Sequence, residues 1–120
     1  MIAASIALAA AAAHGCSGFY AYVPRNLRGE IPFSLQVRDK SVIMKAMDFD
    51  GFDVATERRA DQSLSFENEQ GTEHYRLVCR RDKASVTIAY ARGTPVTYRL
   101  VRARTDIFGV AKAKGWPIGD

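Results

Sequence analysis

The sequence predicts an all-β protein: an antiparallel meander that forms a small barrel or two-layer sandwich of about eight strands, with a short C-terminal helix. Two observations lead to this fold class. After Gly18, apolar residues recur at every second position far more often than at every third or fourth, which is the period of a strand. The connections between these runs are short, and short connections favour antiparallel neighbours.

The length and composition predict one domain. A chain of 120 residues cannot hold two separate cores. With 48% hydrophobic and 25% charged residues, the chain is neither disordered nor collagen-like. No apolar run reaches the roughly 20 residues that a membrane-spanning helix needs. We expect a single β-rich domain over 19–120, after a leader over 1–18.

The first residues are typical of an export signal. Residues 2–13 are Ile, Leu, Ala and one Ser, and small residues follow at 15–18. The basic start of such signals is missing, because no Lys or Arg precedes Arg25. The alternative is a buried Ala-rich helix of a cytoplasmic domain, but such a helix would have no polar face. We therefore expect an export signal or lipoprotein leader, and a protein that is periplasmic, envelope-anchored or secreted.

The two cysteines, Cys16 and Cys79, have alternative roles. If the leader is cleaved after Ala13 or Gly15, Cys16 remains and can pair with Cys79. In an oxidising compartment such a bridge would stabilise the fold by about 4 kcal/mol. Alternatively, Gly15-Cys16 imitates the end of a bacterial lipoprotein signal, in which the cysteine is lipidated, and Cys79 is then a lone thiol. Spacing does not decide between the two, so both remain open.

Alternation places the strands in order. The first two are predicted over 19–23 and 31–37, with Pro32 at the start of the second strand. A hairpin is predicted over 42–49 and 52–57 around Asp50-Gly51, a dipeptide that favours a two-residue type I′ turn. Residues 41–61 also fit helical i,i+4 spacing, and Asp50-Gly51 decides for strands.

The second half repeats the same pattern. Alternating runs predict further strands over 64–66, 75–79, 86–90 and 96–100, with turns at 68–71, 81–83 and 92–95. Thr105 is expected to cap a helix over 106–114, with Gly115 as its stop. Gly109 weakens the prediction of that helix.

Three aspartates form a candidate metal site. The predicted hairpin puts Asp48 opposite Asp53, with Asp50 in the turn, and facing like charges need compensation by a cation or an arginine. The spacing is not that of an EF-hand. We favour a solvated acidic hairpin tip over a metal site.

Charge is segregated along the chain. Residues 48–73 hold eight acids and two bases, whereas 74–114 hold ten bases and two acids. Arg76 and Arg80 share one predicted strand face, and Arg99 extends it from a nearby strand. These residues predict recognition of an anionic partner; the alternative is a β-domain whose arginines reflect coding bias. The export signal argues against nucleic acid, and alternation places the tyrosines in the core.

No catalytic, cofactor, zinc or phosphate-loop signature is recognisable, and we expect no cofactor. The mature chain keeps one secure histidine, His74. A carboxylate pair acting as acid and base is conceivable among a small set of acids, but charged loops supply such pairs in any protein. The set is Glu57, Asp61, Glu67, Glu69 and Glu73.

These observations lead to a functional hypothesis. We expect a small exported module that binds a protein partner in the cell envelope or outside the cell, as an inhibitor, immunity or envelope accessory protein. Any membrane association would be through a lipid on Cys16. The alternatives are a carrier with an apolar barrel interior and a carboxylate-dependent hydrolase. The interior of the carrier would be lined by Phe33, Leu35, Ile88, Tyr90 and Tyr98.

Overall fold

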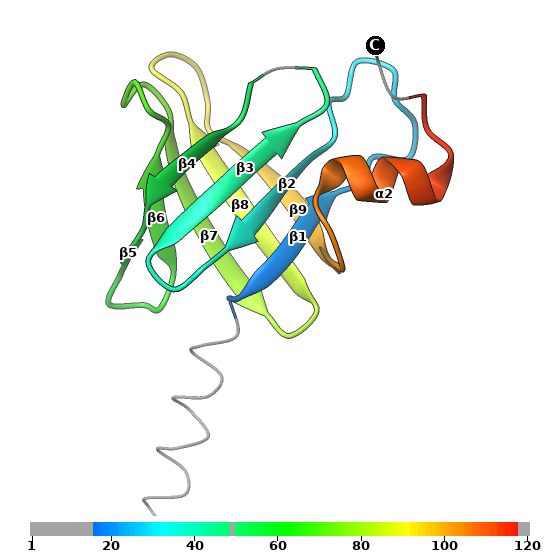
Figure 1. The fold of residues 1–120 in the computed structure, drawn as a ribbon. Helices are drawn as coiled ribbons and strands as arrows, with labels where there is room; N and C mark the ends of the chain where they lie inside the picture. The colour runs from blue at the N-terminus through cyan, green and yellow to red at the C-terminus, as the bar shows by residue number, and fades with distance from the viewer. Residues whose placement is uncertain (1–15, 49, 118–120) are drawn as a thin grey trace, which may run out of the picture.

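The structure is a computed structural model, and it describes residues 16–48 and 50–117. The predicted fold class is confirmed: nine antiparallel strands form a nearly closed barrel with one short helix outside it (Figure 1). The elements are β1 Gly18–Tyr22, β2 Phe33–Val37, β3 Ser41–Ala46, β4 Phe52–Ala55, β5 Glu57–Arg58, β6 Leu64–Glu67, β7 His74–Arg80, β8 Lys83–Ala89, β9 Val96–Ala103 and α2 Ile107–Lys114.

The sheet is a meander whose first and last strands also pair. The strand order is β4-β3-β2-β1-β9-β8-β7-β6-β5, so β1 joins the two halves by pairing with both β2 and β9. The edges of the sheet are β4 and β5. These edges meet at a seam, where β4 and β6 come close without forming a hydrogen-bonded ladder.

The predicted strand over 52–57 is in fact two strands. Residues 52–55 pair with β3, whereas Glu57 and Arg58 pair with β6 on the other side of the seam. The chain turns this corner at Thr56, whose backbone N–H donates to the Lys40 carbonyl over 3.0 Å. The corner explains why nine strands form where about eight were expected, since one alternating run serves both edges of the sheet.

The two-residue turn predicted at Asp50-Gly51 is wrong. Met44 pairs with Phe52 and Ile43 with Asp53, so the connection between β3 and β4 spans 47–51. Residue 49, the predicted end of the first strand, lies outside the described residues. Gly51 is needed for a close approach: a Cβ placed there would lie 1.8 Å from the Met44 carbonyl oxygen. The glycine that suggested a type I′ turn therefore makes room for the neighbouring backbone.

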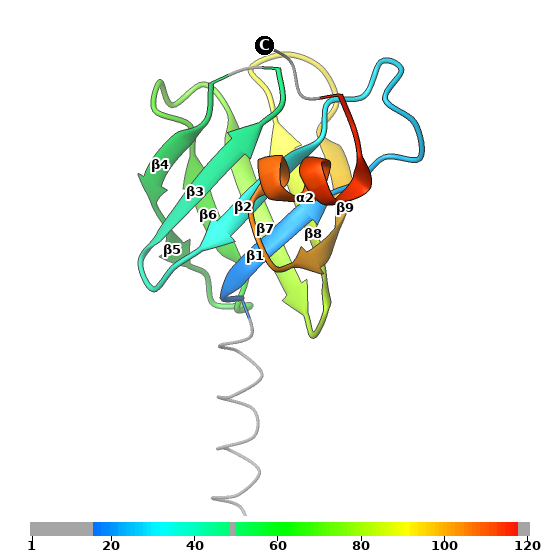
Figure 2. The ribbon, with the colours of Figure 1, turned by 45° about the vertical axis from the view of Figure 1, so that its right-hand side comes forward.

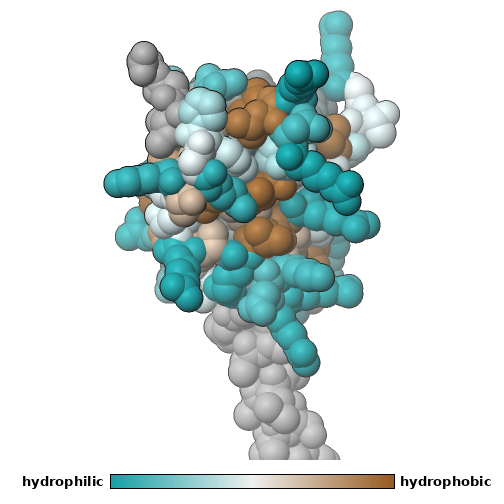
Figure 3. Space-filling model, turned by 90° about the vertical axis from the view of Figure 1, so that its right-hand side faces the viewer, coloured by the Kyte–Doolittle hydropathy of each residue, from teal (hydrophilic) through white to brown (hydrophobic). Residues whose placement is uncertain are grey.

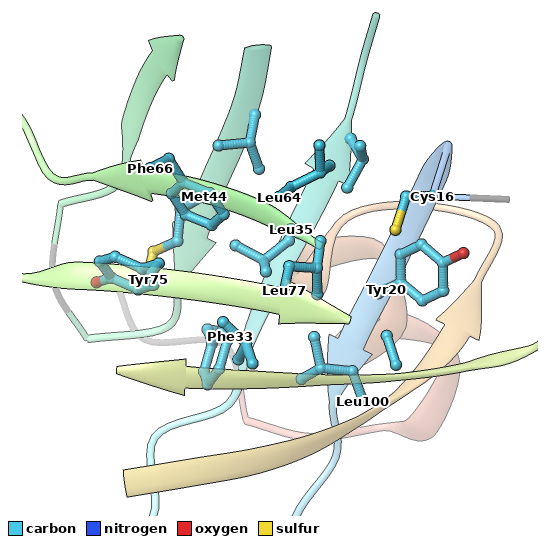
Figure 4. Packing of buried hydrophobic residues seen from close by; sticks show 14 of the residues in the cluster. Cys16, Tyr20, Phe33, Leu35, Met44, Leu64, Phe66, Tyr75, Leu77 and Leu100 are labelled. Atoms are coloured by element: carbon cyan, nitrogen blue, oxygen red, sulfur yellow. The ribbon is translucent and has the colours of Figure 1, made fainter. Parts of the chain in front are cut away.

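The barrel interior is a packed apolar core. Side chains from strands around the barrel point toward one another in Figure 4, and Tyr20, Leu35 and Leu77 have no more than 0% exposure. At the seam, where ladder hydrogen bonds are missing, Phe52, Phe66 and Tyr75 close the gap with their rings. The Phe66 and Tyr75 rings stack with centroids 4.9 Å apart, and Phe52 meets the Tyr75 ring edge-on at 5.4 Å.

The helix α2 lies against the outside of the barrel beside β1 and β2 (Figure 2). Asp106, and not Thr105 as predicted, is its N-cap: the Asp106 carboxylate accepts the N–H groups of Phe108 and Gly109 at 3.1 Å each. Gly115 ends the helix in the left-handed conformation, as predicted. Gly109 leaves room for the Thr105 side chain, which a Cβ would overlap. In the described part of the chain, no helix has the length and apolarity needed to cross a membrane.

Candidate functional site

The three arginines predicted as a binding surface lie on one outer face of the barrel, formed by β7, β8 and β9. On β7, Arg76 and Arg80 point away from the core, while Leu77 between them is fully buried. The ladder pairs Val78 with Ser85 and Ser85 with Arg99. Arg99 therefore lies in the cross-strand row between the rows of Arg76 and Arg80.

Arg76 is held by partners within the protein. Its guanidinium forms an ion pair with Asp61, and its Nε donates to the Ser63 hydroxyl over 3.2 Å. The Ser63 hydroxyl donates in turn to Asp61 over 2.6 Å. These bonds fasten the loop between β5 and β6 to β7, which is a structural role. Arg76 thus contributes less to a binding surface than the sequence predicts.

Arg80 and Arg99 instead share a hollow with Lys83. The hollow has a volume of about 520 Å³, and Val78 and Ser85 contribute to its lining. Arg80 lies directly opposite Lys83 in the β7–β8 ladder. Like charges in such a pair repel each other. Within 16–48 and 50–117, no carboxylate forms an ion pair with any of the three cations. We name Arg80, Lys83 and Arg99 the basic face.

Sequence reasoning missed Lys83 because it placed this residue in a three-residue turn. The turn is shorter, with Arg81 and Asp82 between the paired residues Arg80 and Lys83. Arg81 has a φ of 53°, which lets the chain reverse within two residues. The signal that could have found Lys83 was the alternation of β8, because buried Ala84 and Val86 place Lys83 and Ser85 outside.

The disulfide lies just inside this end of the barrel. Cys16 and Cys79 are bonded, with their Cα atoms 5.4 Å apart, and the bond joins the start of β1 to β7. A sulfur atom in a disulfide has no valence left for a lipid thioether, so the structure supports the first of the two predicted roles for Cys16. Residues 1–15, on which the rest of the leader prediction depends, lie outside the described residues.

The predicted arrangement of the acidic hairpin is wrong. Asp53 lies opposite Ile43 in the ladder and Asp48 lies in the connection between the strands, so the two do not face each other. The wrong turn length caused this error, because a change of register moves every cross-strand partner. Asp50 is exposed in the same connection. Among the residues that the structure describes, no three potential metal ligands lie together.

The five acids considered for catalysis are distributed over three places. Glu57, Glu67 and Glu69 line a hollow of about 590 Å³ at the seam, where the exposed Glu67 lies 2.8 Å from His74 Nδ1. Asp61 holds Arg76, as described above. Glu73 accepts a hydrogen bond of 2.7 Å from the Tyr75 hydroxyl. This bond and burial both raise the pKa of the Tyr75 phenol, with burial the larger cause.

The residues predicted to line a carrier cavity fall into two groups. Leu35 is fully buried in the core. The other four line a small hollow of about 200 Å³ at the end of the barrel opposite the disulfide. We name this hollow the mouth; the loops over 23–32, 68–73 and 90–95 lie around this end (Figure 1).

Apolar surface outside these hollows is discontinuous on the side that carries α2. Figure 3 shows small apolar areas there, separated by hydrophilic side chains. The most exposed of the large apolar side chains, among those described, is Val101 at 48%. Comparison of the chain with protein-family models, with curated proteins and with solved structures finds no match.

Proposed function

We propose that the protein is a small exported binding module that captures a protein partner through the basic face, as an inhibitor, immunity or envelope accessory protein. The observation that carries this proposal is the placement of Arg80 opposite Lys83 with Arg99 nearby, around one hollow. Three cations without an acidic partner in the described chain repel one another. An acidic surface on a partner would relieve this repulsion.

The hollow supports a macromolecular partner with both apolar and acidic groups. Val78 and the methylene stems of the basic side chains offer apolar contact, while guanidinium groups can bind carboxylates through two parallel hydrogen bonds. Arginine is also enriched among the residues that dominate binding energy at protein interfaces. An acidic protein surface satisfies both features.

The disulfide supports the proposed export. Disulfides persist in oxidising compartments and are rare in the cytosol. The intact mass of the protein from its native host tests this part. We expect a chain that begins between residues 14 and 16, with thiols that alkylate only after reduction. An unprocessed chain with two free thiols would contradict export.

Charge reversal tests the basic face. The variant carries Arg80→Glu, Lys83→Glu and Arg99→Glu, and the control carries the same charge change at exposed Arg25, Arg92 and Lys114. A partner from envelope or secreted fractions is captured by the wild type, identified by mass spectrometry, purified and titrated. We expect the basic-face variant to lose at least about tenfold in affinity, and added salt to weaken wild-type binding. Equal losses in both variants would refute this choice of surface.

A further inference from the structure

The mouth of the barrel has a composition opposite to that of the basic face. Its lining includes Phe33, Tyr75, Tyr90 and Tyr98 together with two acids, Glu30 and Glu73. It lies at the ends of strands from both halves of the sheet, so that the meander brings these residues together from positions up to 69 apart in the chain. None of the residues that line it is basic.

The rings at the mouth are ordered by contacts with one another. The Tyr98 ring meets Tyr22 at a centroid distance of 4.9 Å and Phe33 at 5.3 Å, in both cases edge to face. The Tyr22 and Phe33 rings lie 5.6 Å apart. This packing holds the aromatic wall in place before any ligand arrives, which lowers the entropic cost of binding.

Each acid is held by a tyrosine. The Tyr22 hydroxyl donates to Glu30 Oε2 and the Tyr75 hydroxyl to Glu73 Oε1, both over 2.7 Å. The hydrogen bond to Glu30 raises the pKa of Tyr22 to about 12. In the described structure no cation forms an ion pair with either acid. The mouth therefore holds two carboxylates and neutral phenols, a negative site with an aromatic wall.

We propose that the mouth binds one organic cationic group, an alkylammonium or a guanidinium. Such a group combines charge with apolar surface, and it is attracted both by carboxylates and by the faces of aromatic rings. The volume of about 200 Å³ is below that of typical drug-sized sites and suits a single head group. The group belongs either to a free small amine or to a lysine or arginine side chain of a peptide.

Titration of the isotope-labelled protein followed by NMR of the tyrosine rings tests this site. The probes are tetramethylammonium, ethylammonium and guanidinium chlorides, with tert-butanol as a neutral probe of similar shape and sodium acetate as an anion. We expect saturable shifts of the mouth tyrosine signals with the cations, and at most weak, unsaturated shifts with the two controls. Shifts that fail to saturate with every cation, or that tert-butanol reproduces, would overturn the proposal without requiring any variant.

Two variants localise the site. Glu30→Gln and Glu73→Gln keep the size of the side chain and remove its charge, and each is expected to weaken binding of the best cation by about tenfold. The matched control is Glu69→Gln, an exposed acid in the same loop as Glu73 that lines the seam and not the mouth. Unchanged affinity in both mouth variants, or an equal loss in the control, would contradict the site.

The source of the cation is distinguished by comparing free amines with short peptides. N-acetyl-lysine amide and a pentapeptide with one central lysine carry the same group. Tighter binding of the pentapeptide than of ethylammonium indicates a side chain of a protein partner, whereas equal or weaker binding indicates a free amine. Either result supports the cation site, and failure of both probes together with the simple cations refutes it. The proposal does not depend on the basic face, so the two experiments can fail separately.

Discussion

The backbone N–H of Ile107 donates a hydrogen bond of 2.9 Å to the hydroxyl of Ser34, a serine of β2 that is buried on the outside of the barrel. Ile107 is the first residue of α2, and a helix leaves its first N–H groups without partners inside the helix. Ser34 supplies one such partner from the sheet. The bond and the buried Ile107 side chain together attach the helix to β2.

Replacement of Ser34 by alanine is therefore expected to destabilise the protein by about 1–3 kcal/mol, because it leaves the Ile107 N–H buried without an acceptor. Denaturant unfolding measures this loss. The control is Ser65→Ala, on the outer face of β6, where the hydroxyl makes only a long bond of 3.4 Å to the Glu57 carbonyl. We expect a change within about 0.5 kcal/mol there. Equal losses in the two variants would contradict the role given to Ser34.

The N-cap of α2 predicts a dependence of stability on pH. Burial disfavours the charged Asp106, but the ion pair with Lys45 at 2.9 Å and the N–H groups of Gly109 and Phe108 outweigh it and lower the pKa of Asp106. A carboxyl with a lowered pKa in the folded state stabilises the protein above its unfolded pKa. That stabilisation is lost as the pH falls through the folded value.

Asp106→Asn keeps a capping side chain and removes the charge. We expect it to cost roughly 0.5 kcal/mol at pH 7, where Lys45 is half-exposed and the pair is partly screened. The difference from the wild type should shrink at pH values below the unfolded pKa of about 4. Thermal unfolding from pH 2 to 7 measures it, with the exposed Asp39→Asn as control. A difference that stays constant over this range would contradict the assignment.

The disulfide is expected to be the largest single contribution to stability. It joins residues 63 apart in the chain, and closing a loop of that length lowers the entropy of the unfolded state by about 4 kcal/mol in the chain-entropy model. The double variant Cys16→Ala and Cys79→Ala should lose about that amount in denaturant unfolding, and reductant should destabilise the wild type but not the variant. A wild type unaffected by reductant would show that the pair is not bonded in solution.

The sequence predicts most of the strands because one face of each is buried. Alternation is strict where a strand has a core side and a solvent side, as in β7 and β8, and there the predicted and observed positions agree. It is ambiguous where a run changes partner. The run over 52–57 alternates throughout, and nothing local shows that it leaves β3 at Thr56 and continues with β6. That corner depends on closure of the whole barrel.

The candidate site was predictable only in part, for a related reason. Arg80 and Arg99 share a face through a register that alternation could indicate, but the ion pair of Arg76 with Asp61 depends on a loop whose conformation local patterns do not determine. The mouth was hidden more deeply. Its tyrosines read as core residues, and only the assembled barrel shows that they lie at its end beside Glu30 and Glu73.

Gly51 provides a final test of the fold, because two explanations for this glycine predict different results. If it served a type I′ turn, its φ would be positive and asparagine would be tolerated. In the structure its φ is outside the positive range found for five other glycines, and a Cβ would lie 1.8 Å from the Met44 carbonyl oxygen. Both Gly51→Ala and Gly51→Asn should then destabilise the protein by several kcal/mol, on the order of 2–4, because backbone must move to admit a Cβ.

Gly29 is the matched control for these variants. Its φ is 69° and no atom lies within 4 Å of the position of a Cβ, so only the left-handed conformation opposes substitution. Gly29→Ala should cost about 1–2 kcal/mol and Gly29→Asn less, since asparagine visits this conformation more readily. Denaturant unfolding of the four variants separates the cases. A Gly51→Asn variant as stable as the wild type would restore the two-residue turn and, with it, the opposition of Asp48 and Asp53 that the present register excludes.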